Sequence, residues 1–312
     1  MRSPPAIDSA APPAFMSASP RPGSGQTLYD GKLSNLGLGC SQIGSFGNPT
    51  PIGALRNLLA AALELGVTVF DTADIYGQGD SEREIGRVMK KRRDHSFVVT
   101  KCGQIFSTKM RMLAALKPVL KPALAAMGKG KAVTGARAHN IGVDFTPARY
   151  PAALDGSLKR LGFDYVDALL LHGPTADDLA DPAQGEMLAS LKQAGKIRHF
   201  GVSCDDIESV RAALAMPGLT MLELPVNLID EASACDLGMA IKSKGTVVLA
   251  REIMRLRPEL SPLDAVHRSV SDPLTTCTII GTSKIAHLEE LVNAAQSGSG
   301  ASGTRRVGET TF

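Results

Sequence analysis

The sequence predicts a (β/α)8 barrel, an α/β fold, and three observations support this class. Short apolar segments, typical of strands buried on both faces of a parallel sheet, alternate with helical patterns. Eight such segments lie near residues 36–39, 67–70, 97–101, 166–171, 198–203, 220–224, 246–250 and 277–280. Four of them end at an ionisable or polar residue, namely Asp71, Lys101, His172 and Ser203. The doubly wound alternative is disfavoured, since Gly37-Leu38-Gly39 lacks the third glycine of a dinucleotide-binding motif.

Helical patterns separate the predicted strands, as a barrel of alternating units requires. The clearest lie at 52–65, 81–91, 147–161, 184–193, 206–215, 232–243 and 285–296. Ser81 and Glu84 have the spacing of a capping box, which predicts that the second of these helices begins at residue 81. Asp30-Gly31, between Leu28 and Leu33, predicts a small hairpin before the first barrel strand.

Composition divides the chain into a barrel and two tails. Residues 1–26 are rich in Pro, Ala and Ser and are expected to be disordered, as is the Ser/Gly-rich tail over 297–312. The barrel is expected to occupy 27–296. Within it, residues 104–145 break the alternation directly after the Lys101 strand, which predicts an insertion at the mouth of the site. The insertion is either a solvated surface loop or a lid that shapes the substrate pocket.

The bulk properties limit the partners that we expect. A net charge of +3 over 312 residues gives no reason to expect a nucleic acid or a membrane surface. No apolar run is long enough to span a bilayer. Five scattered cysteines without a C-x-x-C pair predict reduced thiols and a cytoplasmic protein. The histidines lack metal-ligand spacing, so no metal is expected. The oligomeric state stays open.

The charged strand ends belong to longer motifs that resemble the aldo-keto reductase superfamily. These motifs are Asp71-Thr72-Ala73-Asp74-Ile75-Tyr76-Gly77, Ser81-Glu82, Thr100-Lys101, Leu169-Leu170-Leu171-His172, the segment 195–203 and Ile280-Gly281-Thr282-Ser283. The resemblance covers roughly residues 33–296. It implies a (β/α)8 barrel that uses NADP, or NAD, to reduce an aldehyde or ketone. In reverse, the same enzyme would oxidise a sugar-like or other alcohol.

The chemistry of carbonyl reduction explains the four catalytic residues that the resemblance implies. Hydride transfer leaves an alkoxide that needs a proton, and Tyr76 is the expected general acid. A free phenol has a pKa of about 10, so the ammonium of Lys101 is expected to lower the pKa of Tyr76. Asp71 is expected to hold Lys101 charged and oriented. His172 is expected to donate a hydrogen bond to the carbonyl oxygen, or to relay a proton at lower pH.

The resemblance also implies the cofactor-binding positions, with some departures from the family. Ser203 corresponds to the serine that binds the nicotinamide amide, and Glu223 stands where the family generally has Gln. Arg251 occupies the position of a side chain that stacks on nicotinamide. The adenosine phosphate is expected at a helix N-terminus, with Gly281, Thr282, Ser283, Lys284, His287 and Glu290 nearby.

Two alternatives of other classes stay open from the sequence. One is a non-catalytic barrel that keeps the nicotinamide site as a regulatory subunit, which Cys204, Glu223 and Leu291 keep possible because they depart from the family. The other is a barrel isomerase or lyase that acts on a phosphorylated metabolite. In each reading the expected partner is a small molecule.

Overall fold

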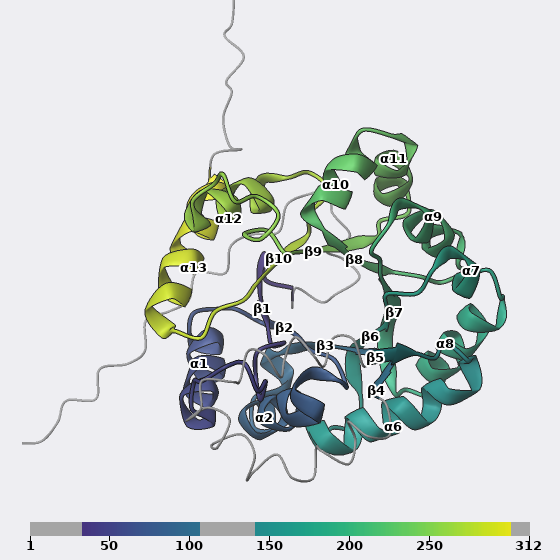
Figure 1. Cartoon of the computed structure of the whole chain (residues 1–312), viewed down its shortest axis with the longest axis horizontal. Helices are drawn as coiled ribbons and strands as arrows, with labels where there is room; N and C mark the ends of the chain where they lie inside the picture. The colour runs from purple at the N-terminus through teal and green to yellow at the C-terminus, as the bar shows by residue number, and fades with distance from the viewer. Residues whose placement is uncertain (1–32, 107–140, 301–312) are drawn as a thin grey trace, which may run out of the picture.

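A computed structural model of the chain describes residues 33–106 and 141–300, and these form a closed barrel of eight parallel strands. Figure 1 shows the barrel viewed nearly along its axis, with helices around the outside. The strands are β1 (Leu36–Gly39), β2 (Val69–Asp71), β3 (Phe97–Cys102), β6 (Val166–His172), β7 (Ile197–Ser203), β8 (Met221–Pro225), β9 (Val247–Arg251) and β10 (Cys277–Ile280). The predicted fold class is confirmed, and each predicted strand overlaps one observed strand.

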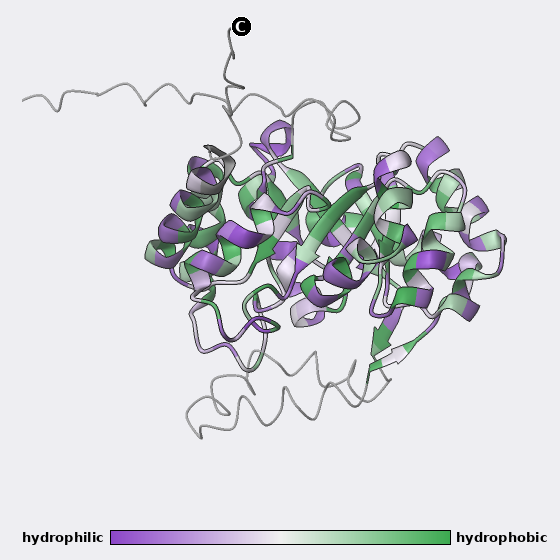
Figure 2. Ribbon diagram, turned by 90° about the horizontal axis from the view of Figure 1, so that it is seen from above, coloured by the Kyte–Doolittle hydropathy of each residue, from purple (hydrophilic) through white to green (hydrophobic). Residues whose placement is uncertain are grey.

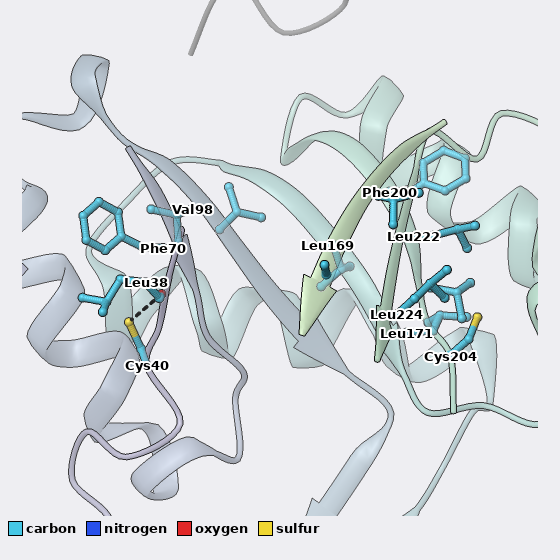
Figure 3. Packing of buried hydrophobic residues seen from close by; sticks show 14 of the residues in the cluster. Leu38, Cys40, Phe70, Val98, Leu169, Leu171, Phe200, Cys204, Leu222 and Leu224 are labelled. Atoms are coloured by element: carbon cyan, nitrogen blue, oxygen red, sulfur yellow. Dashed lines mark hydrogen bonds between the residues drawn. The ribbon is translucent and has the colours of Figure 1, made fainter. Parts of the chain in front are cut away.

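Each barrel strand divides its side chains between two apolar layers, because successive residues of a strand point to opposite faces. One layer lies between strands and helices and includes Phe70, Val98, Leu169 and Leu222, which Figure 3 shows with their neighbours. The other fills the barrel interior with Val69, Phe97, Val99, Ala168, Leu170, Met221, Val247, Leu249, Cys277 and Ile279. Burial on both faces explains why these strands are unbroken apolar runs in the sequence.

The outer helices follow the expected order, with several differences. They are α1 (Ile52–Glu64), α2 (Asp80–Met89), α6 (Tyr150–Leu161), α7 (Ala176–Leu179), α8 (Ala183–Gln193), α9 (Ile207–Ala215), α10 (Val226–Ser233), α11 (Asp236–Ser243), α12 (Pro262–Ser271) and α13 (Ile285–Gly300). The single helix predicted at 232–243 is wrong: α10 and α11 are separate helices. Helix α12 was not predicted, although Ser261 caps it by accepting a hydrogen bond from the Asp264 amide.

The predicted capping box at Ser81 is also wrong. Helix α2 begins at Asp80, and Ser81 lies inside it, fully buried. The Ser81 hydroxyl donates to the Cys40 carbonyl at 3.0 Å and lies 2.7 Å from the Thr72 hydroxyl. It therefore ties α2 to the ends of β1 and β2 instead of capping a helix.

The insertion starts and ends as a small antiparallel sheet. Strand β4 (Gln104–Phe106) leaves the end of β3 and pairs with β5 (Ile141–Val143). The possible lid between these strands lies outside the described residues, as do the predicted hairpin at Asp30-Gly31 and the tail over 1–26. Helix α13 continues through residues 297–300, which the composition assigned to the C-terminal tail, and the rest of that tail is not described.

The described helices are amphipathic and cover the barrel. Figure 2 shows apolar residues concentrated on the strands and polar residues frequent on the outer helices. Within 33–106 and 141–300, no helix has the length and apolar character needed to cross a bilayer.

Candidate active site

The site lies where the interior face of the barrel strands reaches their carboxyl ends. Two residues after an interior apolar side chain, the next inward position of a strand is polar: Asp71 follows Val69, and Lys101 follows Val99. The same step leads from Leu170 to His172 and from Met221 to Glu223. Strand periodicity therefore brings polar groups from distant parts of the sequence onto one layer at the top of the barrel.

A cavity of about 360 Å³ opens on this layer. Seven predicted site residues line it: Asp71, Tyr76, His172, Ser203, Glu223, Arg251 and Gly281. Lys101 lies beneath them with no exposed surface. The structure thus brings the four catalytic candidates together with three of the cofactor candidates and the start of the loop at Gly281.

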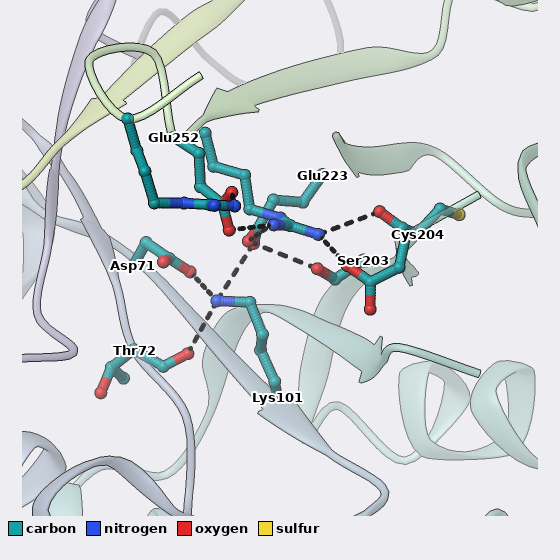
Figure 4. A network of polar contacts seen from close by, with 10 residues as sticks. Asp71, Thr72, Lys101, Ser203, Cys204, Glu223 and Glu252 are labelled. Atoms are coloured by element: carbon teal, nitrogen blue, oxygen red, sulfur yellow. Dashed lines mark hydrogen bonds and ion pairs between the residues drawn. The ribbon is translucent and has the colours of Figure 1, made fainter. Parts of the chain in front are cut away.

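Lys101 is the centre of a buried ionic cluster, which Figure 4 shows. Its ammonium donates to the Asp71 carboxylate and to the Thr72 carbonyl, the latter at 3.2 Å. The Glu223 carboxylate lies 3.0 Å from the same nitrogen. A buried ammonium is tolerated only where such partners replace its hydration, so Lys101 depends on these groups.

The cluster holds Lys101 in its charged form. Burial acts to lower the pKa of Lys101, but the carboxylates of Asp71 and Glu223 outweigh it, so the pKa is raised. Burial and the charge of Glu223 raise the pKa of Asp71 to about 7, against the lowering effect of Lys101. The expectation that Asp71 keeps Lys101 charged agrees with this geometry, with Glu223 as a second partner.

A left-handed turn places Tyr76 over the cluster. The turn contains Gly77, Gln78 and Gly79, with φ values of 57°, 61° and 83°. A side chain at Gly77 would also meet the Ile43 carbonyl oxygen at 2.4 Å, so the position requires glycine. The Tyr76 ring centroid lies 5.4 Å from the Lys101 ammonium and 5.8 Å from the His172 ring, which it meets edge-on.

The environment of Tyr76 corrects one expectation from the sequence. Lys101 does act to lower the pKa of Tyr76, as predicted. Burial has a larger effect in the opposite direction, and the carboxylates of Asp71 and Glu223 add to it. The pKa of Tyr76 is therefore raised above its usual range, and the group is a phenol at neutral pH.

His172 is held in its neutral form. Burial, together with the charges of Lys101 and Arg251, lowers the pKa of His172 well below its ordinary value. A neutral imidazole keeps one N–H donor, which suits hydrogen bonding to a carbonyl oxygen. The lowered pKa argues against the alternative that His172 relays a proton in moderately acidic solution.

Arg251 spans the cavity wall between three strand ends. Its guanidinium donates to the Cys204 carbonyl at 3.0 Å and pairs with Asp205 and with Glu252. Its Nε atom lies 3.5 Å from Glu223. The Cys204 thiol itself is fully buried among the apolar residues of the outer layer (Figure 3), so its side chain does not face the cavity.

The residues predicted for the adenosine phosphate lie apart from the polar cluster. Only Gly281 lines the cavity. The Thr282 hydroxyl accepts from the Lys284 amide at 3.2 Å, which forms the start of α13. Thr282 and Ser283 are half-buried on this loop, while Lys284, His287 and Glu290 are exposed. These five residues form an open rim that continues outward from Gly281.

Sequence reasoning missed several residues of the cavity wall. Gln104, Asp205 and Glu252 line it, and each follows a predicted site residue by one to three positions. Their closeness in sequence to predicted site residues was the signal that could have identified them. Glu252 also adopts a φ of 62°, a strained conformation for a residue other than glycine. The other missed lining residues are Gly39, Ser41, Ile279 and Ile280.

Comparison with known proteins agrees with this arrangement. The model of the aldo/keto reductase family matches residues 35–255. The chain belongs to the aldo/keto reductase family. This family assignment confirms the resemblance seen in the sequence motifs.

Individual relatives are distant and longer than the matched region. The chain is 27% identical over 224 residues to the NADH-specific methylglyoxal reductase of Escherichia coli, and 29% identical over 229 residues to the aldo-keto reductase YhdN of Bacillus subtilis. These matches cover 69% and 72% of this chain, and 62% and 60% of the relatives.

Solved structures share the fold at low identity. The holo form of aldo-keto reductase AKR11C1 from Bacillus halodurans has a TM-score of 0.66 at 23% identity, covering 85% of this chain and 87% of that one. An aldo/keto reductase from Klebsiella pneumoniae, in complex with NADP and acetate, has a TM-score of 0.59 at 21% identity, with coverages of 84% and 86%.

Proposed function

We propose that this aldo/keto reductase reduces an aldehyde or ketone to the alcohol with NAD(P)H, and that Tyr76 is its general acid. The observation that carries the proposal is the convergence of Tyr76, Lys101 and His172 at one cavity, with Asp71 bound to Lys101. A phenol, an ammonium and a neutral imidazole at one point provide a proton donor, a positive charge and a second hydrogen-bond donor for a developing alkoxide.

Each residue has a separate role in the proposal. Tyr76 donates its proton to the substrate oxygen, and Lys101 stabilises the phenolate that this leaves. Asp71 orients Lys101 through their ion pair. His172 donates a hydrogen bond that holds the carbonyl oxygen toward Tyr76. In the reverse direction, the phenolate of Tyr76 accepts the proton of an alcohol.

The polar groups of the cavity suit a nicotinamide cofactor, which supplies the hydride when bound. Ser203 and Glu223 present a hydroxyl and a carboxylate to an amide, and the planar guanidinium of Arg251 offers a surface for stacking. Gly281, Thr282, Ser283 and Lys284 lead outward to the N-terminus of α13, a helix of 16 residues. Backbone amides and Lys284 there favour a phosphate, with His287 and Glu290 on the following turn.

We infer NADP as the preferred cofactor because Lys284 adds a positive charge at the rim. The Klebsiella neighbour is described with NADP, whereas the Escherichia coli relative is named NADH-specific, so use of NAD is the direct alternative. We propose a small carbonyl compound as substrate, and the cytoplasm as location, since all five cysteines are free thiols.

The proposal is tested by measuring NADPH and NADH binding by calorimetry and their oxidation with 4-nitrobenzaldehyde as a probe substrate. Binding together with carbonyl-dependent oxidation supports the reductase. Binding without turnover over a panel of aldehydes and ketones would instead support a regulatory subunit. Absence of binding to both cofactors would overturn the proposal and favour a barrel isomerase or lyase.

A further inference from the structure

The wall of the cavity carries more carboxylates than cations. The carboxylates that line it belong to Asp71, Asp205, Glu223 and Glu252. Among the residues that the structure describes, Arg251 is the only lysine or arginine that lines the same cavity. Lys101 lies beneath the wall with no exposed surface, so it cannot meet a charged group at the far end of a substrate. A substrate therefore enters a space in which acidic groups outnumber basic ones.

The N–H groups of Arg251 are already occupied by the protein. One terminal nitrogen donates to the Glu252 carboxylate at 2.6 Å. The other donates to the Cys204 carbonyl at 3.0 Å and to the Asp205 carboxylate, and Figure 4 shows the Cys204 and Glu252 ends of this network. The Nε atom faces Glu223 at 3.5 Å. An anionic group of a substrate must displace one of these acceptors before it can pair with the guanidinium, whereas the flat face of the guanidinium stays available for stacking.

Asp205 is the most exposed carboxylate of the wall. Its side chain is 65% accessible, against 30% for Glu252. Its Oδ1 atom pairs with Arg251. Its Oδ2 atom lies toward Gly173, where an added Cβ would be 2.9 Å away. Gly173 directly follows His172, the proposed donor to the carbonyl oxygen, so this carboxylate stands beside the part of the cavity that the substrate occupies.

We propose that Asp205 is a specificity-determining residue, through which the enzyme selects uncharged carbonyl compounds over those that carry a carboxylate or another anionic group. The inference rests on the proposed function and narrows its substrate class. Asp205 acts in two ways: its charge repels an anionic substrate, and its ion pair occupies N–H groups of Arg251 that such a substrate would need. Arg255 does not supply them, because it pairs with Glu252.

The test compares two aldehydes of matched shape that differ in charge, 4-carboxybenzaldehyde and 4-formylbenzamide. The measured quantity is the ratio of kcat/KM for the acid to kcat/KM for the amide, with NADPH as the reductant. We expect this ratio to be well below one in the wild type. It should rise as salt is added, because salt screens the repulsion between charges near the surface.

Three variants separate the charge of Asp205 from other effects, and the intrinsic reactivity of each aldehyde cancels when their ratios are compared with the wild-type ratio. Asp205→Asn should raise the ratio by about five- to tenfold, the size expected for one charge about 4 Å from another in a hydrated site. Asp205→Glu keeps the charge and should stay close to the wild type. Asp236→Asn is the matched control: Asp236 also pairs with an arginine, Arg211, and is 66% exposed, but does not line the cavity, so the ratio should not change.

The outcomes distinguish this inference from the proposed function. A wild-type ratio of one or more, or a ratio that Asp205→Asn leaves unchanged, would overturn the inference and leave the reductase assignment intact. An equal rise in Asp236→Asn would show that the effect is not local to the cavity, and would also overturn it. If no aldehyde, charged or uncharged, supports oxidation of NADPH or NADH, the proposed function itself fails and this inference fails with it.

Discussion

Removal of the Lys101 charge should destabilise the protein strongly, because it leaves two buried carboxylates without their shared partner. The substitution Lys101→Met keeps most of the side-chain volume and removes the ammonium. At 3.0 Å, the attraction between Lys101 and Glu223 alone is about 5 kcal/mol at an effective dielectric of 20. Desolvation offsets part of this, and breaking a buried pair typically costs about 3–5 kcal/mol. We expect a loss of this size in the free energy of unfolding.

Urea denaturation measures the loss and also tests its electrostatic origin. Without Lys101, the pKa of Asp71 should rise further, since Lys101 acts to lower it. A carboxyl group whose pKa is higher in the folded state than in the unfolded state lowers the free energy of unfolding as pH rises. The deficit of Lys101→Met should therefore be larger at about pH 8 than at about pH 5.

A surface pair provides the matched control for this prediction. Lys196 pairs with Asp155 where both side chains are partly exposed, at 38% and 55%. Lys196→Met should cost less than about 1 kcal/mol, because water screens such pairs. A deficit in Lys101→Met no larger than that of Lys196→Met, or one that does not change with pH, would refute the reasoning.

Three further predictions concern other residues of the site. Asp74 has a buried Oδ1 without a hydrogen-bond partner, and burial with the charge of Glu82 raises the pKa of Asp74 to about 7. The wild type should therefore lose stability relative to Asp74→Asn as pH rises from about 5 to about 8, which urea denaturation measures. Gly77→Ala should lower kcat more than it changes cofactor affinity, because a side chain there meets the Ile43 carbonyl at 2.4 Å and displaces Tyr76; unchanged kcat would contradict this. Lys284→Ala should weaken NADPH binding by about tenfold in calorimetry and leave NADH binding nearly unchanged, as loss of one exposed phosphate contact implies.

The barrel and the polar layer at its top could be predicted because both follow from strand periodicity. Val99 and Lys101 illustrate this, since a two-residue step carries the interior face from apolar packing to chemistry. The same step relates Met221 to Glu223. Strands buried on both faces appear in the sequence as unbroken apolar runs, so the polar residue that follows each run can be identified without a structure.

Features that depend on contacts between distant segments could not be predicted. Nothing local indicates that Glu223 meets Lys101, 122 positions earlier in the chain, or that burial, together with two carboxylates, outweighs the effect of Lys101 on the pKa of Tyr76. Ser81 had the spacing of a helix cap, but burial against Cys40 and Thr72 gave its hydroxyl another role. The break between α10 and α11 was hidden because small residues continue the helical pattern across it.

The most direct test of the account is the activity of Tyr76→Phe, which removes only the hydroxyl oxygen of the proposed proton donor. We predict that kcat/KM for NADPH-dependent carbonyl reduction falls by about 10²- to 10⁴-fold while calorimetry shows NADPH binding close to that of the wild type. Activity within a factor of a few of the wild type, with cofactor binding intact, would contradict the assignment of Tyr76 as the general acid.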